Sequence, residues 1–301
     1  MDRHIRTDLA LELKDDVEEG SLDGIKIYTK KNQGTNIVET RIDVMNEKGE
    51  KTLGKPVGTY ITLESTALRG SDEDIHKPLS ETLHKYLKTM IRGKEKILVV
   101  GLGNREVTPD ALGPYVVDNL YITRHLLAEG IVSSVREISA ISPGVMAQTG
   151  IESSTILKAL CEKVKPDVVI AVDALAAREP SRLNSTIQIC DTGISPGAGV
   201  GNNRIMLNEE TLGVKVIAIG VPTVISVPAI VYQAIDSMLE AILDKNVKVE
   251  DSLSEEDKYN VACELLEPEL AAMFVTPKNI DEAVKRVSFT ISEAINKFFE
   301  L

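Results

Sequence analysis

The order of hydrophobic and polar positions divides the chain near residue 90. Before that point, residues 24–64 contain short runs rich in β-branched residues, IKIYT, NIVETRIDV and GTYITLE, separated by turn-forming stretches such as KNQG and NEKG. These runs predict two or three antiparallel strands. Residues 71–90 have the spacing of an amphipathic helix, and the acidic residues at its start suit a helix N-terminus. Residues 1–20 are polar and highly charged without a period, so we expect an exposed arm.

After residue 90, apolar runs alternate with helical patterns. Parallel strands are expected at 97–100, 135–141, 168–172 and 214–219, with helices at 114–128, 152–164 and 228–243. Another strand is possible at 187–190, and two helices, 254–273 and 280–299, close the chain. The pattern therefore predicts an α/β fold: a mostly parallel, twisted sheet flanked by helices, with a small antiparallel β element at the N-terminal end.

Composition narrows the class of partner. With 301 residues and 43% apolar content, the chain can form one large α/β domain or two small ones. A net charge of −12 and a pI near 5.0 argue against binding to nucleic acid or an anionic membrane, since both need a cationic surface. The chain shows neither a membrane span nor the apolar segment of a signal peptide. Three scattered cysteines indicate a reducing cytoplasm rather than a disulfide framework.

Two aspartates follow apolar runs in similar settings. Asp110 lies in KILVVGLGNREVTPDALGP and Asp173 in PDVVIAVDALAAREP, each beyond a run that reads as a buried strand. Parallel strands bring the residues after their C-terminal ends to one edge of the sheet, where such folds place their ligands. Two carboxyl groups that meet there cannot both ionise cheaply, so the pair supplies an acid and a base. A structural reading also exists: Asp110 as a helix cap and Asp173 as a loop anchor.

A second candidate group follows Asp173. Arg178 and Arg182 come soon after it, and the glycine-rich stretch 191–204 ends with Arg204. Glycines such as Gly197 and Gly199 let backbone amides approach a substrate, and arginines grip carboxylates with paired hydrogen bonds. A flexible surface loop is the plainer interpretation. The GLGN turn at residues 101–104 does not start a dinucleotide-binding motif, because Glu106 stands where that motif requires glycine.

Five long motifs follow one another over nearly the whole chain: HIRTDLALE, VVGLGNREVTPDALGP, VDALAAREPSRLNSTIQICDTGISPGAGVGNNR, AIGVPTV and FVTPKNID. Together they resemble the germination protease family of spore-forming bacteria. The resemblance implies a fold similar to hydrogenase-maturation endopeptidases. It also implies an atypical aspartic endopeptidase that degrades small acid-soluble spore proteins in the cytoplasm of the spore core. In that family the two strand-end aspartates are the proposed catalytic pair, which corresponds to Asp110 and Asp173.

The resemblance also implies a zymogen, a homotetramer and removal of an N-terminal propeptide. Family cuts fall after an acidic residue and before a large apolar residue and alanine. The sequence Asp8-Leu9-Ala10 has this form, so Asp8–Leu9 is the candidate self-cleavage bond. Residues 1–8 would then be the propeptide and 9–301 a single peptidase domain. We expect Arg178, Arg182 or Arg204 to hold the acidic residue before the cut, an assignment made from charge alone.

Other classes of function remain open on the sequence. A metal-assisted peptidase would use the same edge of the sheet, but the chain has no histidine after His125, and two aspartates are few ligands for a transition metal. We therefore expect no metal and no cofactor. A phosphorylase-like or nucleotide-binding protein would hold phosphate on the amides of the loop 191–204. A catalytically silent binding protein on the same scaffold is the remaining alternative.

Overall fold

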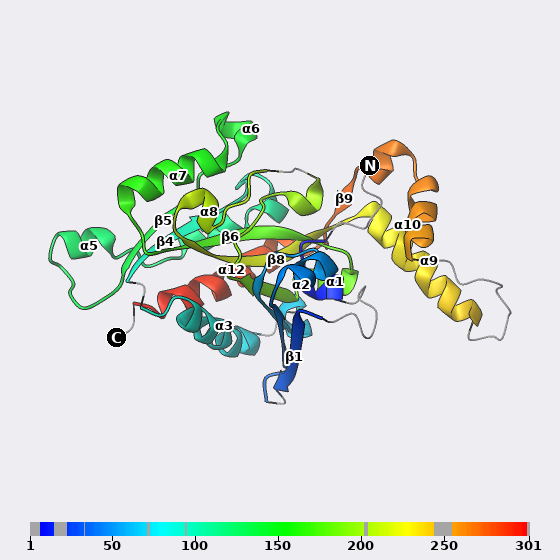
Figure 1. The fold of residues 1–301 in the computed structure, drawn as a ribbon, viewed down its shortest axis with the longest axis horizontal. Coiled ribbons are helices and arrows are strands. Elements are labelled where there is room, and N and C mark those ends of the chain that lie inside the picture. Colours follow the sequence, from blue (N-terminus) through cyan, green and yellow to red (C-terminus); the bar gives the residue numbers. More distant parts are fainter. Residues whose placement is uncertain are drawn as a thin grey trace.

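A computed structural model describes residues 7–14, 23–32, 34–70, 73–93, 95–201, 204–243 and 255–299. Within these residues nine strands form one sheet in the order β1-β2-β3-β7-β8-β6-β4-β5, and β9 pairs with β8 (Figure 1). The strands are β1 (Ile25–Asn32), β2 (Ile37–Val44), β3 (Gly58–Glu64), β4 (Lys96–Gly101), β5 (Glu137–Ile141), β6 (Val168–Ala177), β7 (Thr186–Cys190), β8 (Lys215–Ser226) and β9 (Phe274–Val275).

The sheet combines a parallel and an antiparallel part. β8, β6, β4 and β5 are parallel neighbours, as expected for the four apolar runs after residue 90. β1, β2 and β3 are antiparallel and join the parallel part through β7, which is antiparallel to both β3 and β8. The predicted fold class is confirmed. The N-terminal β element is continuous with the main sheet.

Helices cover both faces of the parallel part. The α-helices are α1 (Ala10–Lys14), α2 (Glu47–Leu53), α3 (His76–Met90), α4 (Leu112–Asp118), α5 (Arg124–Ala128), α6 (Met146–Thr149), α7 (Ser153–Val164), α8 (Glu209–Leu212), α9 (Val227–Leu243), α10 (Glu255–Glu264), α11 (Pro268–Ala271) and α12 (Ile280–Asn296). Figure 1 shows α3 and α12 on one side of the sheet and α7 and α8 on the other, while α9 and α10 extend away from it. Buried residues of α3, α4 and α12 form the largest apolar cluster with alternate residues of the strands. α7 and α8 cover the opposite face.

Two predicted helices are interrupted. The helix expected at 114–128 is split into α4 and α5, because the Asn296 side chain binds the carbonyl of Asn119 and the amide of Tyr121 between them. The helix expected at 254–273 is split into α10 and α11. Pro268 starts α11 at a first-turn position, where its missing N–H costs nothing, and it could not have continued α10.

The prediction of an exposed N-terminal arm is wrong for the residues that the structure describes. Leu9, Ala10 and Glu12 are 0% exposed, and Leu11 is 5% exposed. The apolar side chains pack into two separate clusters, and the carboxyl oxygens of Glu12 accept from backbone amides of the loop after β6. The segment is buried although the surrounding sequence is polar, because its apolar side chains have apolar neighbours and its carboxyl group has hydrogen-bond donors. Residues 1–6 and 15–20 lie outside the described residues.

A turn prediction is also wrong. The NEKG stretch begins α2, because the Asn46 side chain accepts hydrogen bonds from the amides of Lys48 and Gly49. Asparagine at this position satisfies amides that a helix start leaves unpaired. Gly54 ends α2 in the left-handed conformation. Lys55 follows this short helix, and its ammonium group donates to the carbonyl of Asp8 in the N-terminal segment.

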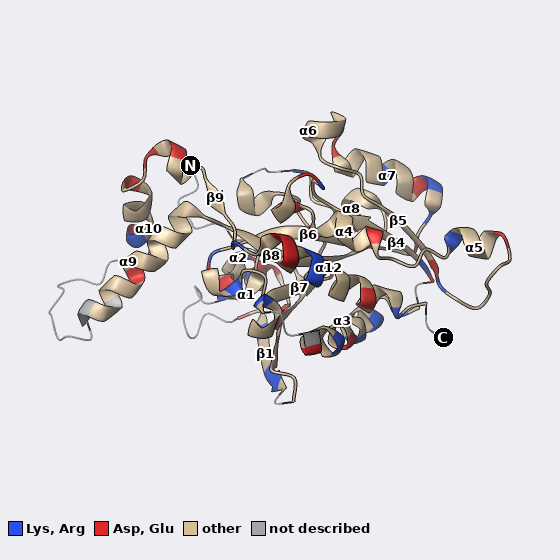
Figure 2. Cartoon of the chain, turned by 180° about the vertical axis from the view of Figure 1, so that it is seen from behind, with Lys and Arg blue, Asp and Glu red and all other residues tan. Residues whose placement is uncertain are grey.

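Acidic and basic side chains are mixed over the surface. On the face shown in Figure 2, Lys and Arg are scattered among acidic residues along the helices and turns. Among the described residues, no helix is both long and apolar enough to cross a membrane.

Candidate active site

Asp110 and Asp173 line the same small cavity, whose volume is ≈ 170 Å³. The cavity lies at the end of the β4–β6 pairing and is lined in part by the glycine-rich loop. Its remaining lining residues are Leu102, Gly103, Gly144, Val145, Ser153, Pro196, Gly197, Val200 and Arg204. Two carboxyl groups from separate parts of the sequence therefore line one cavity together with one guanidinium group.

Asp173 owes its place to the different lengths of two strands. β4 pairs with β6 only as far as Gly101 and Val172, and Leu102 then donates its amide to the carbonyl of Val172. Asp173 is the next residue along β6. The sequence predicted that β6 ends before Asp173, but the strand continues to Ala177 because β8 keeps pairing with it. Asp173 is thus inside a strand yet beyond the end of its neighbour, with 4% of its surface exposed.

Asp110 reaches the same place through a tightly folded loop. The loop leaves β4, makes one 3-10 turn at Thr108–Asp110 and enters α4. A Cβ on Gly101 would lie 2.2 Å from the carbonyl oxygen of Gly113, and a Cβ on Gly103 2.0 Å from that of Asp110. Only glycine allows so close an approach. The GLGN turn therefore presses Asp110 against the strand ends, and no side chain caps α4.

Burial raises the pKa of both carboxyl groups, and repulsion from neighbouring carboxylates raises that of Asp173 further. For Asp173 the pKa lies well above its ordinary value, first because of burial and then because Asp110 and Asp8 are close. Burial also raises the pKa of Asp110. The backbone amide of Asn104, which donates to Asp110 Oδ2 at 2.7 Å, and the charge of Arg204 both lower it. Asp173 therefore holds a proton more readily, while Asp110 keeps the partners that stabilise its charge.

The three arginines expected from the sequence take different positions. Arg204 lines the small cavity and lowers the pKa of both aspartates. Arg178 donates from its guanidinium to the carbonyl of Glu12 at 2.6 Å. Arg182 pairs with Glu12 at 3.5 Å and with Glu64 at 2.6 Å. Two of the three therefore hold an acidic residue of the N-terminal segment itself.

Asp8 lies directly against the strand that carries Asp173. Its amide donates to the carbonyl of Ala176 at 3.1 Å, and its carboxylate accepts from the amide of Ala176 at 2.9 Å. Burial raises the pKa of Asp8, whereas Ala176, Lys55 and the backbone amide of Gly199 lower it. Leu9 packs into an apolar cluster with Leu175 and its neighbours. The Asp8–Leu9 bond is thus held at the candidate site.

Glycines of the loop 191–204 make this contact possible. A Cβ on Gly199 would lie 2.1 Å from Asp8 Oδ2 and 2.7 Å from the Cβ of Ala176. Gly197, which lines the small cavity, adopts the left-handed conformation with φ of 72°. The loop thus has one glycine beside the acidic side chain and another beside the two aspartates.

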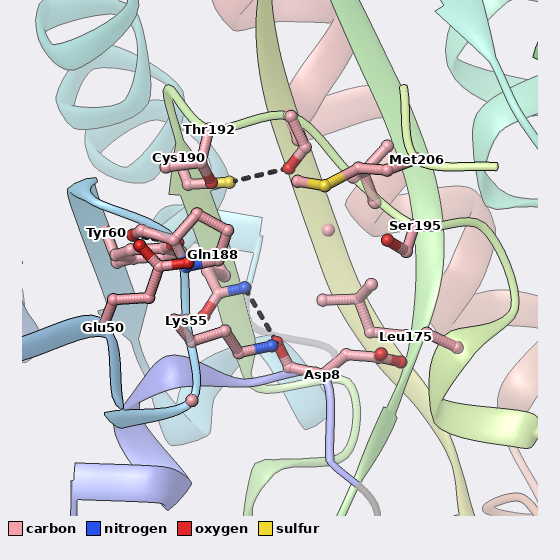
Figure 3. Close-up of a pocket in the computed structure, with 17 residues that line it drawn as sticks. Asp8, Glu50, Lys55, Tyr60, Leu175, Gln188, Cys190, Thr192, Ser195 and Met206 are labelled. Atoms are coloured by element: carbon pink, nitrogen blue, oxygen red, sulfur yellow. Dashed lines mark hydrogen bonds between the residues drawn. The ribbon is translucent and has the colours of Figure 1, made fainter. Parts of the chain in front are cut away.

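A larger cavity of ≈ 490 Å³ lies on the other side of the same loop. Ser195 and Ala198 line it, whereas Pro196, Gly197 and Val200 line the small one. Figure 3 shows Lys55 and Gln188 converging on Asp8 at this cavity. Sequence reasoning missed Lys55, Gln188 and Glu12, because their roles depend on contacts between segments that are far apart in the sequence.

The described residues contain no cluster of three or more His, Cys, Asp and Glu side chains with the geometry of a metal site. Two carboxyl groups and a guanidinium group can carry out acid–base chemistry on a bound substrate without further groups. The arrangement can therefore activate a water molecule and protonate a leaving group in one place.

Comparison with known proteins gives the family. A family model described as germination protease matches residues 5–251. The chain is 43% identical to a germination protease of Caldanaerobacter subterraneus subsp. tengcongensis over 97% of this chain and 93% of the relative. It belongs to the germination protease family. A germination protease of Clostridium tetani is 43% identical, over 97% and 94% of the two chains, and one of Bacillus cytotoxicus is 37% identical, over 97% and 92%.

Among solved structures, the chain resembles a [NiFe] hydrogenase maturation protease, HycI, from Thermococcus kodakarensis. The TM-score is 0.34 at 18% identity, and the match covers 70% of this chain and 98% of the other. Membership of the germination protease family supports a peptidase that acts in spore germination.

Proposed function

We propose that the protein is an endopeptidase that hydrolyses small acid-soluble spore proteins through the pair Asp110 and Asp173. The observation that carries this proposal is the cavity that the two carboxyl groups share, together with the raised pKa that each has there. Enzymes place acid and base side by side in this way so that one group is protonated and the other is ionised at the same pH.

The roles follow from the surroundings of each group. Asp110, with the amide of Asn104 and Arg204 nearby, is the ionised base that takes a proton from water. The hydroxide oxygen adds to the peptide carbonyl carbon. Asp173 is the acid that gives its proton to the departing nitrogen as the C–N bond breaks, and the proton taken by Asp110 restores the pair. One water molecule is consumed for each bond cut.

The acidic residue before the cut is recognised by backbone amides. Asp8 supports this, because its carboxylate accepts from Ala176 and lies against Gly199. A substrate residue in the same position would find the same donors, and fixed amides bind carboxylates without a side chain that must be ordered first. Arg204 acts on the catalytic pair, while Arg178 and Arg182 anchor the segment after the cut through Glu12.

The N-terminal segment is then a substrate in cis. Cleavage of Asp8–Leu9 would release residues 1–8 as a propeptide and leave residues 9–301 as the mature peptidase domain. Leu9 and Glu12 are completely buried, which would keep the new N-terminus attached after the cut. The family resemblance further supports a homotetramer that works in the spore core without a cofactor, a metal or nucleic acid.

Incubating the full chain with a small acid-soluble spore protein and mapping all fragments by mass spectrometry tests this proposal. Asp110→Asn and Asp173→Asn should both abolish cleavage in trans and at Asp8–Leu9, with unchanged circular dichroism. Asp118→Asn is the matched control, because Asp118 is an exposed partner of Arg105 on the same loop and helix. Persistent cleavage by either site variant contradicts the pair.

A further inference from the structure

Two side chains from different parts of the fold meet at the carbonyl oxygen of Asp8. Lys55 donates from Nζ at 3.1 Å and Gln188 from Nε2 at 3.2 Å. The other end of the Gln188 amide accepts from the backbone of Ala10 at 2.7 Å. Gln188 therefore bridges the two sides of the Asp8–Leu9 bond. This carbonyl is the one that hydrolysis at Asp8–Leu9 must attack.

Gln188 stands in the same cross-strand row as Asp173. On the sheet it stands opposite Gly220 of β8, and Gly220 stands opposite Asp173 of β6. Residues paired across neighbouring strands point to the same face, so Gln188 and Asp173 share a face with only a glycine between them. A Cβ on Gly220 would meet the Leu175 side chain at 2.3 Å. The missing side chain at Gly220 thus leaves room for Leu175, which packs in one apolar cluster with Leu9.

Lys55 comes from a different part of the chain than Gln188. It follows α2 and lines the larger cavity together with Gln188 and Asp8, as Figure 3 shows. Its positive charge also lowers the pKa of the Asp8 side chain, so Lys55 acts on the carboxylate as well as on the carbonyl oxygen. Two donors on the carbonyl and two backbone amides at the carboxylate thus surround one acidic residue.

We propose that Lys55 and Gln188 hold the carbonyl oxygen of the acidic residue before the cut, and hold the new α-carboxylate after it. The site then selects peptides that end in aspartate, with the side chain on the amides of Ala176 and Gly199 and the C-terminus on Lys55 and Gln188. This rests on the proposed function, since it assigns the substrate site of that same peptidase. In the attacked state both donors face the oxygen on which negative charge develops.

The chemistry explains why a cation belongs here. Hydrolysis adds a water oxygen to the carbonyl carbon and releases the Leu9 amine, so a neutral acceptor becomes a carboxylate. The neutral amide of Gln188 can donate to the carbonyl oxygen before the cut and to the α-carboxylate after it. The ammonium of Lys55 forms an ion pair at this position only with the α-carboxylate of the product. The released peptide is therefore expected to leave slowly and to inhibit.

The test uses the full chain with Lys55→Met, Lys55→Arg and Gln188→Leu. Cleavage at Asp8–Leu9 and of a spore-protein substrate is followed by mass spectrometry. Loss of one such donor should slow cleavage about 100-fold. Lys55→Arg keeps the charge and should stay within about tenfold of the parent chain. Lys51→Met, which changes an exposed lysine of α2, should cleave like the parent. Thermal melting checks that each variant is folded.

Product binding supplies an independent readout. A free peptide with the sequence of residues 1–8 is added to the spore-protein reaction, in one arm with a C-terminal carboxylate and in the other with a C-terminal amide. The carboxylate form should inhibit at least about tenfold more strongly, the size of one charge-assisted hydrogen bond. The preference should disappear with Lys55→Met.

The outcomes separate the two proposals. If the parent chain cleaves neither its own Asp8–Leu9 bond nor the spore-protein substrate, the proposed function fails, and the site assignment fails with it. If the parent cuts but Lys55→Met and Gln188→Leu cut equally fast, only the site assignment is overturned. Equal inhibition by the carboxylate and amide peptides overturns it as well. Faster self-cleavage in either variant does the same, since the two side chains would then restrain the bond.

Discussion

Replacing Gly199 by alanine should close the position that holds the acidic side chain. The added Cβ would lie 2.1 Å from Asp8 Oδ2, where ordinary contact begins at 3.4 Å. The carboxylate must therefore retreat by about 1.3 Å. The new methyl group cannot avoid Asp8 by moving toward Ala176, because the same Cβ already lies 2.7 Å from the Ala176 side chain. Gly199 has no left-handed φ, so the substitution tests space rather than backbone strain.

The size of the effect follows from the hydrogen bond that is lost. The amide of Ala176 donates to Asp8 Oδ2 at 2.9 Å, and a retreat of this size takes the oxygen out of bonding range. A hydrogen bond to a charged group contributes about 1.5–3 kcal/mol. If the contact is needed to position the bond, cleavage should slow by roughly 10- to 150-fold.

The assay follows release of residues 1–8 from the full chain by mass spectrometry, together with cleavage of a spore-protein substrate. Gly34→Ala is the matched control, because Gly34 is an exposed turn glycine with 3.6 Å of space and no left-handed φ. That variant should cleave at the parental rate. If Gly199→Ala melts normally and still cleaves at the parental rate, the proposed binding position for the acidic side chain beside Gly199 is refuted.

Three further results are expected. Asp173→Asn removes a carboxyl group whose pKa is raised by burial and by Asp110. Because the folded chain binds that proton more tightly than the unfolded chain, the parent loses stability as the pH rises from about 4 through the raised pKa. The variant should therefore be more stable than the parent by about 1–2 kcal/mol at pH 7 and equally stable below pH 4, as measured by urea unfolding across pH. A stability difference that is independent of pH contradicts this. Leu9→Ala empties a completely buried position and should cost about 2–5 kcal/mol by the same measurement, unless the segment is not docked in solution. A chelator such as EDTA should leave cleavage unchanged, and loss of activity that one added metal restores would favour the metal-assisted alternative.

Patterns within the sequence predicted the elements that local chemistry determines. The four apolar runs after residue 90 became β4, β5, β6 and β8, because continuous apolar stretches are buried on both faces of a parallel sheet. The breaks in the predicted helices could not be read in the same way. The split between α4 and α5 depends on the side chain of Asn296, which is more than 170 residues away in sequence.

The candidate site divides along the same line. Asp110 and Asp173 could be picked out because each follows an apolar run, and a fold rule brings such positions together. Lys55 and Gln188 carry no such signal. One follows a short helix hidden in a turn-like sequence, and the other stands in a strand whose alternation gives no hint of a ligand.

The N-terminal segment shows why a charged stretch can still be buried. The Glu12 side chain is 0% exposed, yet its carboxyl group accepts from the amides of Arg178 and Glu179 at 2.8 Å and pairs with Arg182. Burial raises its pKa and these partners lower it again. The two amides lie 166 and 167 residues away in the sequence. The acidic side chain of this segment is thus matched by donors from a distant part of the chain. This is what we expect if the segment is a substrate held in cis.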